Sequence, residues 1–127
     1  MNIIYNNFLQ YLSSIDIEPM NTLKDNSVSF KRNSLNYIFE ADRNDPAFFR
    51  IVLPNIDDYN ASKAETIRKL SAKFKVAKLI VVNQQICIVA EQFVYSPLSK
   101  SSWFIMFDRI VNLLNQVIDE YRELHQR

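Results

Sequence analysis

Few side chains in this sequence are of the types that catalyse reactions or bind metals. His125 is the single histidine and Cys87 the single cysteine. A general base, a nucleophile or a metal ligand needs partners held beside it, and these two residues lie far apart in the chain. We therefore expect His125 to be a solvated imidazole at a helix end. We expect Cys87, which lies in an apolar run, to serve as a small hydrophobic residue.

The carboxylates gather in three places: Asp42 with Asp45, Asp57 with Asp58, and Asp119 with Glu120 and Glu123. Mg²⁺ or Ca²⁺ would need several of these oxygens to converge, and none of the groups has the spacing of an EF-hand loop. The chain has no glycine, which excludes the P-loop, the dinucleotide-binding fingerprint and the serine nucleophile elbow. We expect these carboxylates to serve in turns and on the surface.

The absence of a catalytic pattern predicts a protein that is not an enzyme, with no catalytic residue, no cofactor and no metal. The alternative is a small enzyme with a carboxylate-based or metal-dependent site around the Asp-rich loops. Such an enzyme would gather Asp42, Asp45 and Asp57 in one pocket.

The charge of the chain is nearly balanced, with 15 basic and 14 acidic residues and a net charge of +1. Nucleic-acid-binding domains usually carry a basic stripe or patch, and none is visible in the sequence. We expect no nucleic-acid partner. A patch that assembled in three dimensions would draw on Lys31, Arg32, Arg43, Arg50, Lys63, Arg68, Lys69, Lys73, Lys75 and Lys78.

No segment approaches the roughly 20 apolar residues of a membrane span. The first ten residues, MNIIYNNFLQ, lack both a basic leader and a continuous apolar run, so they do not resemble a secretory signal. We expect no membrane partner and a cytoplasmic location.

Periodicity and breaker residues predict helices at 2–15, 61–74 and 101–127, and strands at 27–33, 35–41, 47–53, 76–82 and 85–95. Pro54 is expected to end the pairing of the third strand and to open a loop over 55–60. Ser101 or Ser102 is expected to cap the last helix. Residues 18–26 are expected to form a polar connection. With no glycine, Asn and Asp must supply the turn residues that need positive φ.

The last helix carries a broad apolar stripe that must lie on a sheet or on other helices. The stripe is formed by Trp103, Phe107, Ile110, Leu114, Val117, Tyr121 and Leu124. The fold class is therefore α+β, in one domain over 1–127. We expect the order α-β-β-β-α-β-β-α and a mainly antiparallel five-stranded sheet with the long C-terminal helix packed on it.

This order resembles the fold shared by type III secretion chaperones and the bacterial YbjN-like sensory transduction regulator family. The segments that carry the resemblance are SVSFKRNSLNYIFEAD, FFRIVLPNI and AKLIVVNQQICIVAEQFVY, followed by the long amphipathic helix. The resemblance covers nearly the whole chain and carries no active site. It implies a small, often dimeric, cytoplasmic binding protein.

Three predicted strands are apolar on both faces, whereas an antiparallel strand with one wet face should alternate cleanly. Phe48 and Val52 lie opposite the inner residues of the third strand. In the last two strands we assign Leu79, Val81, Val89 and Phe93 to one face and Ile80, Val82, Ile86 and Ile88 to the other. Something must cover the second face, either the middle helix or a second subunit or peptide.

The function that these features favour is a non-enzymatic protein-binding module, chaperone-like or regulatory, acting as a homodimer or on a protein or peptide partner. It would bind on the sheet face or at an edge strand. The interface candidates are Phe48, Val52, Phe93, Tyr95 and Trp103, because aromatic residues are enriched at binding hot spots. For each of them a place in the core is the alternative.

Overall fold

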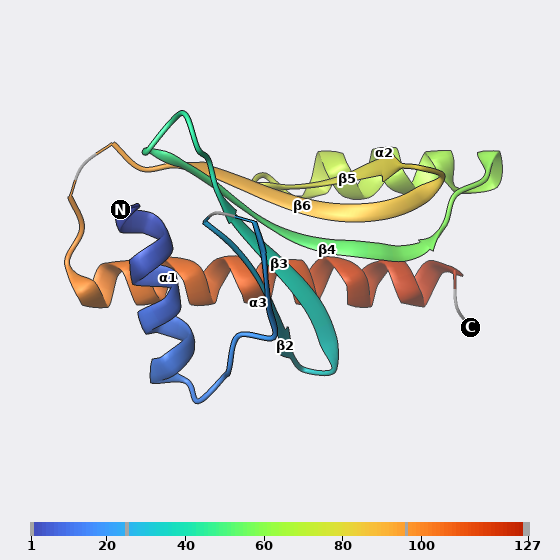
Figure 1. Cartoon of the computed structure of the whole chain (residues 1–127). Helices are drawn as coiled ribbons and strands as arrows, with labels where there is room; N and C mark the ends of the chain where they lie inside the picture. Colours follow the sequence, from blue (N-terminus) through green and yellow to red (C-terminus); the bar gives the residue numbers. More distant parts are fainter. Residues whose placement is uncertain (1, 25, 96, 126–127) are drawn as a thin grey trace.

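The computed structural model describes residues 2–24, 26–95 and 97–125. Its elements are α1 (Ile3–Ser14), β1 (Asn21–Lys24), β2 (Ser27–Arg32), β3 (Leu35–Ala41), β4 (Phe48–Asp58), the 3₁₀ turn η1 (Ala61–Lys63), α2 (Ala64–Lys73), β5 (Ala77–Val82), β6 (Gln85–Phe93) and α3 (Lys100–His125) (Figure 1). The α+β class and the predicted order are confirmed, with one added strand. Residues 126 and 127, where the predicted last helix ends, lie outside the described residues.

The sheet has six strands in the order β1-β2-β3-β4-β6-β5, and every neighbouring pair is antiparallel. The prediction of five strands missed β1. This strand is four residues long, too short for an alternating pattern to separate it from the polar connection around it.

Two of the hairpins turn through two-residue loops whose residues both have positive φ, as type I′ turns require. Asn33 and Ser34 have φ of 54° and 64°, and Asn83 and Gln84 have φ of 51° and 62°. Asn therefore leads both turns, as expected for a chain without glycine. The second position is filled by residues that adopt this conformation less readily than glycine.

The prediction that Pro54 ends its strand is wrong. β4 continues to Asp58, and its register with β6 shifts between Leu53 and Asp57. Pro54 and Asn55, which has φ of 51°, lie in this irregular stretch, where a missing ladder N–H is tolerated. Pairing with β6 resumes at Asp57, so most of the predicted 55–60 loop belongs to the strand.

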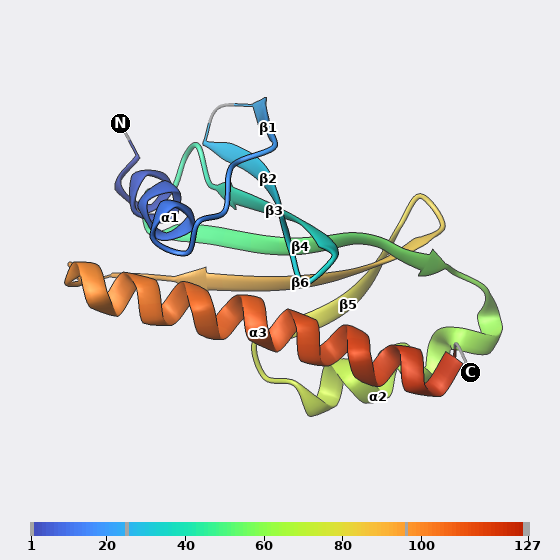
Figure 2. The ribbon, with the colours of Figure 1, turned by 90° about the horizontal axis from the view of Figure 1, so that it is seen from below.

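The hydrophobic core lies between the sheet and the helices α1 and α3 (Figure 2). Phe107 of α3 lies at the centre of an aromatic cluster, with its ring 5.0 Å from Phe8, 6.0 Å from Phe39 and 5.5 Å from Phe49. The Phe8 ring stacks on Phe39 at 4.0 Å. This packing buries the apolar stripe of α3, as its spacing predicts.

The cap of α3 lies two to three residues earlier than expected. The backbone N–H of Ser102 donates to Oγ of Ser99 at 3.2 Å, and the N–H of Trp103 donates to the carbonyl of Ser99 at 3.0 Å. These are the bonds of an N-cap residue to the third and fourth residues that follow it. Ser99 therefore caps the helix, not Ser101 or Ser102.

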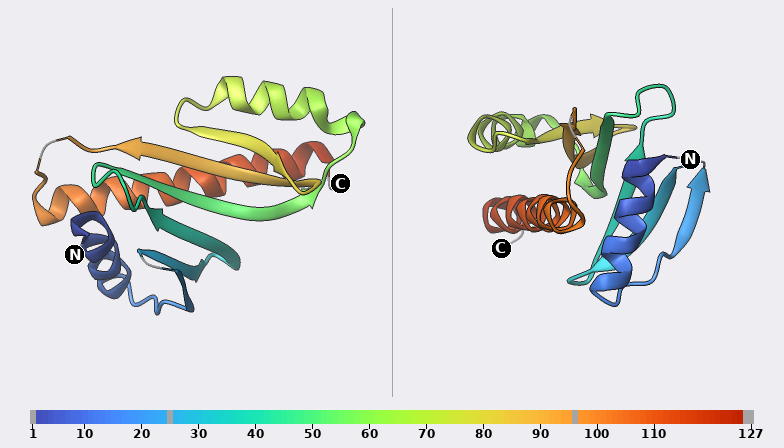
Figure 3. Two further views of the ribbon diagram at one scale, coloured as in Figure 1. Left: turned by 45° about the horizontal axis from the view of Figure 1, so that its top comes forward. Right: turned by 90° about the vertical axis from the view of Figure 1, so that its left-hand side faces the viewer.

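The middle helix α2 lies along the β5 edge of the sheet and beside α3. Its Ser71 Oγ accepts from the backbone N–H of Leu79 at 3.0 Å, and Lys73 pairs with Glu120 of α3 at 2.8 Å. Leu70 and Phe74 join the same core cluster as α3. In the right-hand view of Figure 3, α2 and α3 are seen nearly end-on, side by side. α2 therefore blocks an edge, and no helix of the described residues lies over the second face of the sheet.

Among the described residues, no helix combines the length and the apolar character that crossing a membrane requires.

Candidate functional site

The strongest candidate site is the face of the sheet that points away from α1 and α3, here called the outer face. Alternation along β4 decides which residues lie on it: Phe49, Ile51 and Leu53 are buried in the core, so Phe48 and Val52 point outward. By the same alternation and register, the outer residues are Asn36, Ile38 and Glu40 of β3, Cys87, Val89, Glu91 and Phe93 of β6, and Lys78, Ile80 and Val82 of β5.

The cross-strand register arranges the centre of this face in three rows. Phe48 pairs with Phe93, Arg50 with Glu91, and Val52 with Val89. On the other side of β4, Arg50 lies opposite Glu40 and Val52 opposite Ile38 of β3. Directly opposed residues in antiparallel strands have Cβ atoms about 5 Å apart. The outer face therefore has an aromatic row, a charged row and an aliphatic row across β4 and β6.

The aromatic row extends beyond β6. The Phe48 and Phe93 rings lie 4.8 Å apart, and the Phe93 ring stacks on Tyr95 at 5.7 Å. The side chains of Phe93 and Tyr95 are 49% and 82% exposed. Arg50 contributes a cation–π contact, with its guanidinium carbon 5.6 Å from the Phe48 ring centroid. Three of the five predicted interface residues therefore meet in one exposed cluster, and Val52 lies two residues from Phe48.

Trp103, the fifth predicted residue, lies elsewhere. It is 5% exposed and packs on Phe107 at 5.6 Å, so it occupies the place in the core that was the alternative for each candidate. Its position on the inward stripe of α3 is the signal that separates it from the other four.

The outer face is apolar on β5 as well, where Ile80 and Val82 are 42% and 47% exposed. The sequence-based grouping of faces across β5 and β6 is wrong. The two-residue loop pairs Val82 with Gln85 and so places Leu79 opposite Ile88 on the inner face. Val89 and Cys87 therefore lie on the outer face. Cys87 and Val89 are buried although neither belongs to the core cluster, so outer neighbours cover them.

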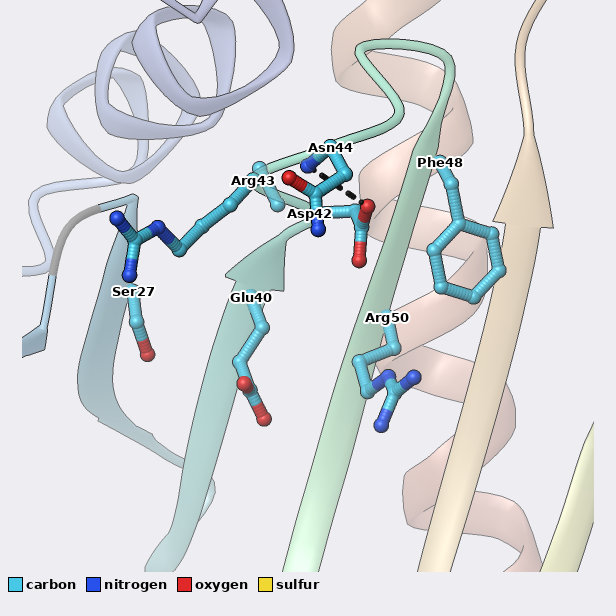
Figure 4. Close-up of a pocket in the computed structure, with 8 residues that line it drawn as sticks. Ser27, Glu40, Asp42, Arg43, Asn44, Phe48 and Arg50 are labelled. Atoms are coloured by element: carbon cyan, nitrogen blue, oxygen red, sulfur yellow. Dashed lines mark hydrogen bonds between the residues drawn. The ribbon is translucent and has the colours of Figure 1, made fainter.

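A polar hollow of about 280 Å³ lies at one end of the outer face, beside the β3–β4 loop. Figure 4 looks onto this face: the side chains of Glu40, Arg50 and Phe48 lie in front of their strands, and α3 passes behind them. Arg43 of the loop reaches over Ser27. The Ser27 hydroxyl is buried, without a hydrogen-bond partner among the described residues.

The carboxylates that an enzyme would use hold local structure. The Asp42 carboxylate accepts from the backbone N–H groups of Asn44 at 3.0 Å and Asp45 at 2.7 Å, which closes the β3–β4 loop. Asp57, near the far end of β4, accepts from the Tyr121 hydroxyl at 2.6 Å and pairs with Lys63 at 2.9 Å. Among the described residues, no group of three or more His, Cys, Asp or Glu side chains could hold a metal ion.

His125 contacts Thr66 of α2, with Nε2 and Oγ1 2.6 Å apart. It therefore joins the C-terminal end of α3 to α2, which the expectation of a solvated imidazole did not foresee. No neighbouring residue in the sequence signals this contact, because it arises from the packing of two helices.

Six of the ten basic residues considered for nucleic-acid binding gather on or next to α2: Lys63, Arg68, Lys69, Lys73, Lys75 and Lys78. Carboxylates already engage three of them, because Lys63 pairs with Asp57, Arg68 with Glu65 and Lys73 with Glu120. Lys78 donates to the carbonyl of Ser71 at 2.7 Å. This basic group was not visible as a stripe in the sequence because its members have mixed helical and strand positions.

A second apolar surface runs along the exposed side of α3. It is a groove of about 630 Å³ lined by Val76, Leu98, Ile105, Met106, Arg109 and Leu113, among others. It lies on the helical side of the sheet, away from the rows of the outer face.

These features define an α+β protein with the YbjN-like arrangement of helices and sheet. The crystal structure of YbjN from E. coli, described as a candidate transcription regulator, matches this chain with a TM-score of 0.73. The match covers 99% of this chain and 97% of YbjN, at 10% sequence identity. The likeness shows a shared fold and confirms the predicted resemblance to the YbjN-like fold. No protein-family model and no curated protein sequence matches the chain.

Proposed function

We propose that this chain is a non-enzymatic protein-binding module, chaperone-like or regulatory, that acts in the cytoplasm through its outer face as a homodimer or on a protein or peptide partner. The observation that carries the proposal is the outer face of β4, β5 and β6, whose exposed apolar residues lie under no helix of the described part of the chain. Large contiguous apolar patches on monomers usually mark interaction sites.

The composition of the face supports protein binding over small-molecule chemistry. Phe93 and Tyr95 present aromatic rings of the kind that dominate binding energies, and Ile80 and Val82 of β5 offer exposed aliphatic surface on the same face. The charged row of Glu40, Arg50 and Glu91 can fix the orientation of a partner, because complementary charges favour specificity more than affinity.

Strand addition at β5 has less support than face binding. The α2 helix occupies this edge, where Ser71 already accepts from the backbone N–H of Leu79. A covered edge cannot offer that N–H to an incoming strand. The proposal therefore places the partner on the face.

A carboxylate-based enzyme remains the competing function, and the geometry gives it less support. Asp42 and Asp45 lie before β4 and Asp57 near its end, so one pocket does not gather them. A thermal-shift series with Mg²⁺, Ca²⁺, Mn²⁺ and Zn²⁺ separates the two functions. A saturable rise in the melting temperature with one of these metals would favour the enzyme.

The proposal is tested by capture with Phe93→Asp. Because Phe93 is half exposed, the change should leave the fold intact while it places a charge in the aromatic row. We expect the immobilised wild type to retain proteins from lysate of its own cells that the variant does not retain. Ala72→Asp, at an exposed position of α2, is the matched control and should retain the same proteins as the wild type. Identical retention by the wild type and Phe93→Asp would contradict the proposal.

A further inference from the structure

We propose that the polar hollow at one end of the outer face binds a free α-amino acid, with its carboxylate held by Arg43 and Ser27 and its ammonium group held by Glu40. This site goes beyond the proposed function, because it takes a small zwitterion and leaves the apolar part of the face to a protein partner. The inference follows from the residues that form the floor and the wall of the hollow.

The floor of the hollow is a polar row that crosses three strands. Ser27 of β2 lies directly opposite Glu40 of β3, and Glu40 lies directly opposite Arg50 of β4. Ser27 belongs to the outer face because its neighbour Val28 is buried in the core. Neighbouring strands are about 4.8 Å apart, so the row presents a hydroxyl, a carboxylate and a guanidinium in succession at roughly that interval.

The β3–β4 loop forms the wall of the hollow. The Asp42 carboxylate accepts from the backbone N–H groups of Asn44 and Asp45, which fixes the loop beside the polar row. Arg43, an exposed residue of this loop, reaches over Ser27 (Figure 4). A guanidinium and a hydroxyl, both of which can donate hydrogen bonds, therefore lie at the same end of the hollow.

The Ser27 hydroxyl is the observation that points to a ligand. Ser27 is 1% exposed and lines the hollow, and its hydroxyl has no hydrogen-bond partner among the described residues. Buried hydroxyls in folded proteins nearly always have a partner. An acceptor oxygen of a molecule in the hollow would supply one. Beneath the Arg43 guanidinium, the oxygen that fits best is that of a carboxylate.

The charges around the hollow select a zwitterion. The hollow is lined by the guanidinium groups of Arg43 and Arg50 and by the carboxylates of Glu40 and Asp42. A simple anion would meet the two carboxylates, and a simple cation would meet the two guanidinium groups. A ligand with one charge of each sign avoids both conflicts, because like charges opposed across an interface are unfavourable.

The spacing of the row selects an α-amino acid among zwitterions. Its carboxylate and ammonium groups are attached to the same carbon atom, so they lie close enough together to reach Ser27 and Glu40 on adjacent strands. The Glu40 carboxylate has about four lone-pair sites, so it can accept from an ammonium group in addition to a contact within the protein. The side chain of the ligand would then lie toward Arg50 and Phe48. A volume of about 280 Å³ is near the lower end for small-molecule sites, as suits a ligand of this size.

The test is a titration of the isotope-labelled full chain with L-glutamate, L-leucine and L-phenylalanine, followed by NMR. At least one of these probes should shift the backbone amides of Ser27 and of residues 40–44 saturably, with half-saturation at about 1 mM or below. The N-acetyl and amide derivatives of the tightest probe lack the ammonium charge and the carboxylate, respectively. Each derivative should bind at least about tenfold more weakly than the probe itself. No saturable shift with any probe, shifts confined to other residues, or equal binding of either derivative would overturn the inference.

Two variants test the groups that hold the carboxylate. Arg43→Gln keeps an exposed polar side chain and should raise the Kd at least about tenfold. Ser27→Ala should raise the Kd about fivefold or more, yet leave the melting temperature unchanged or higher, because it removes a buried hydroxyl without a partner. Arg122→Gln, at an exposed position of α3, is the matched control and should bind like the wild type. A lower melting temperature for Ser27→Ala, or unchanged binding by Arg43→Gln, would contradict the site.

Discussion

At the scale of single residues, a three-membered polar cluster ties α1, β2 and α3 together. The Asp108 carboxylate accepts from the Tyr11 hydroxyl at 2.8 Å and from the Arg32 guanidinium at 2.9 Å, and Arg32 also donates to the Tyr11 oxygen at 2.8 Å. Burial raises the pKa of the Asp108 carboxyl, but the hydrogen bonds from Tyr11 and Arg32 outweigh it and hold this pKa below its usual value. Burial and the bond to Asp108 raise the pKa of the Tyr11 hydroxyl.

The change Asp108→Asn should lower the free energy of unfolding by about 1 kcal/mol at pH 7, because the cluster is partly exposed and its bonds are charge-assisted. The folded pKa of Asp108 lies below the unfolded value of about 4. Its stabilising contribution is therefore full above that pH and is lost as the pH falls through the folded pKa. Urea unfolding at pH 7 and pH 3 should show a difference between wild type and variant that shrinks in acid.

Asp119→Asn is the matched control, since the exposed Asp119 of α3 accepts from Asn115 at 3.3 Å within its own helix. It should change stability by less than about 0.5 kcal/mol at either pH. Equal effects of the two changes would mean that the cluster contributes nothing specific.

The second type I′ turn offers a stabilising change. Gln84 has φ of 62°, and a left-handed conformation costs a residue with a side chain roughly 1 kcal/mol compared with glycine. Asn-Gly is the preferred pair in such turns. Gln84→Gly should therefore raise the free energy of unfolding by about 0.5 kcal/mol or more, measured by urea denaturation.

The substitution Gln92→Gly, in the regular part of β6, is the control for Gln84→Gly. There the added backbone freedom of the unfolded chain should destabilise the protein by about 0.5–1 kcal/mol. A loss of stability with Gln84→Gly would contradict the turn assignment.

At the scale of elements, the sequence predicted what depends on local pattern and turn chemistry. The stripe of α3 and the alternation in β2 and β3 place these elements within a residue or two of their bounds. The sequence did not predict β1, because this strand is defined by its pairing with β2. It also did not predict the extension of β4 beyond Pro54, because that extension depends on renewed pairing with β6 after an irregular stretch. Long-range pairing decides both features, and local propensity does not report it.

The same distinction explains the candidate site. Phe48, Val52, Phe93 and Tyr95 could be selected because apolar residues on both sides of a strand are visible in the sequence. The charged row could not be predicted from the sequence, because only the pairing register between β4 and its neighbours brings its residues together. The grouping of faces in β5 and β6 failed for the same reason, since counting through a two-residue loop reverses the parity.

The cap of α3 gives a prediction at this scale. Ser99→Ala should lower the free energy of unfolding by about 1 kcal/mol, because it removes the acceptor for the Ser102 N–H at the start of the longest helix. Ser101→Ala, one position inside the helix, should have little effect or stabilise slightly. Thermal unfolding of both variants followed by circular dichroism measures this. A greater loss with Ser101→Ala would place the cap where the sequence suggested.

At the scale of the whole molecule, the helices cover one face and one edge of the sheet. α1 and α3 bury the inner face, and α2 covers the β5 edge beside α3. This leaves the outer face as the broad apolar surface of the sheet that the described part of the chain does not cover. The architecture is therefore that of a layered protein with one side of its sheet open, and the account assigns binding to that side.

The most direct test of the central claim is site-specific photo-crosslinking from the outer face in living cells. A photoreactive phenylalanine derivative at Phe93 should form a covalent adduct on irradiation, because a bound protein lies within reach of the aromatic row. The same derivative at Lys69 on α2 should form none. An adduct of twice the mass of one chain would identify a second copy, and another mass would identify a different partner. No adduct from Phe93, with the protein folded and irradiated under conditions that crosslink a known dimer, would contradict the account.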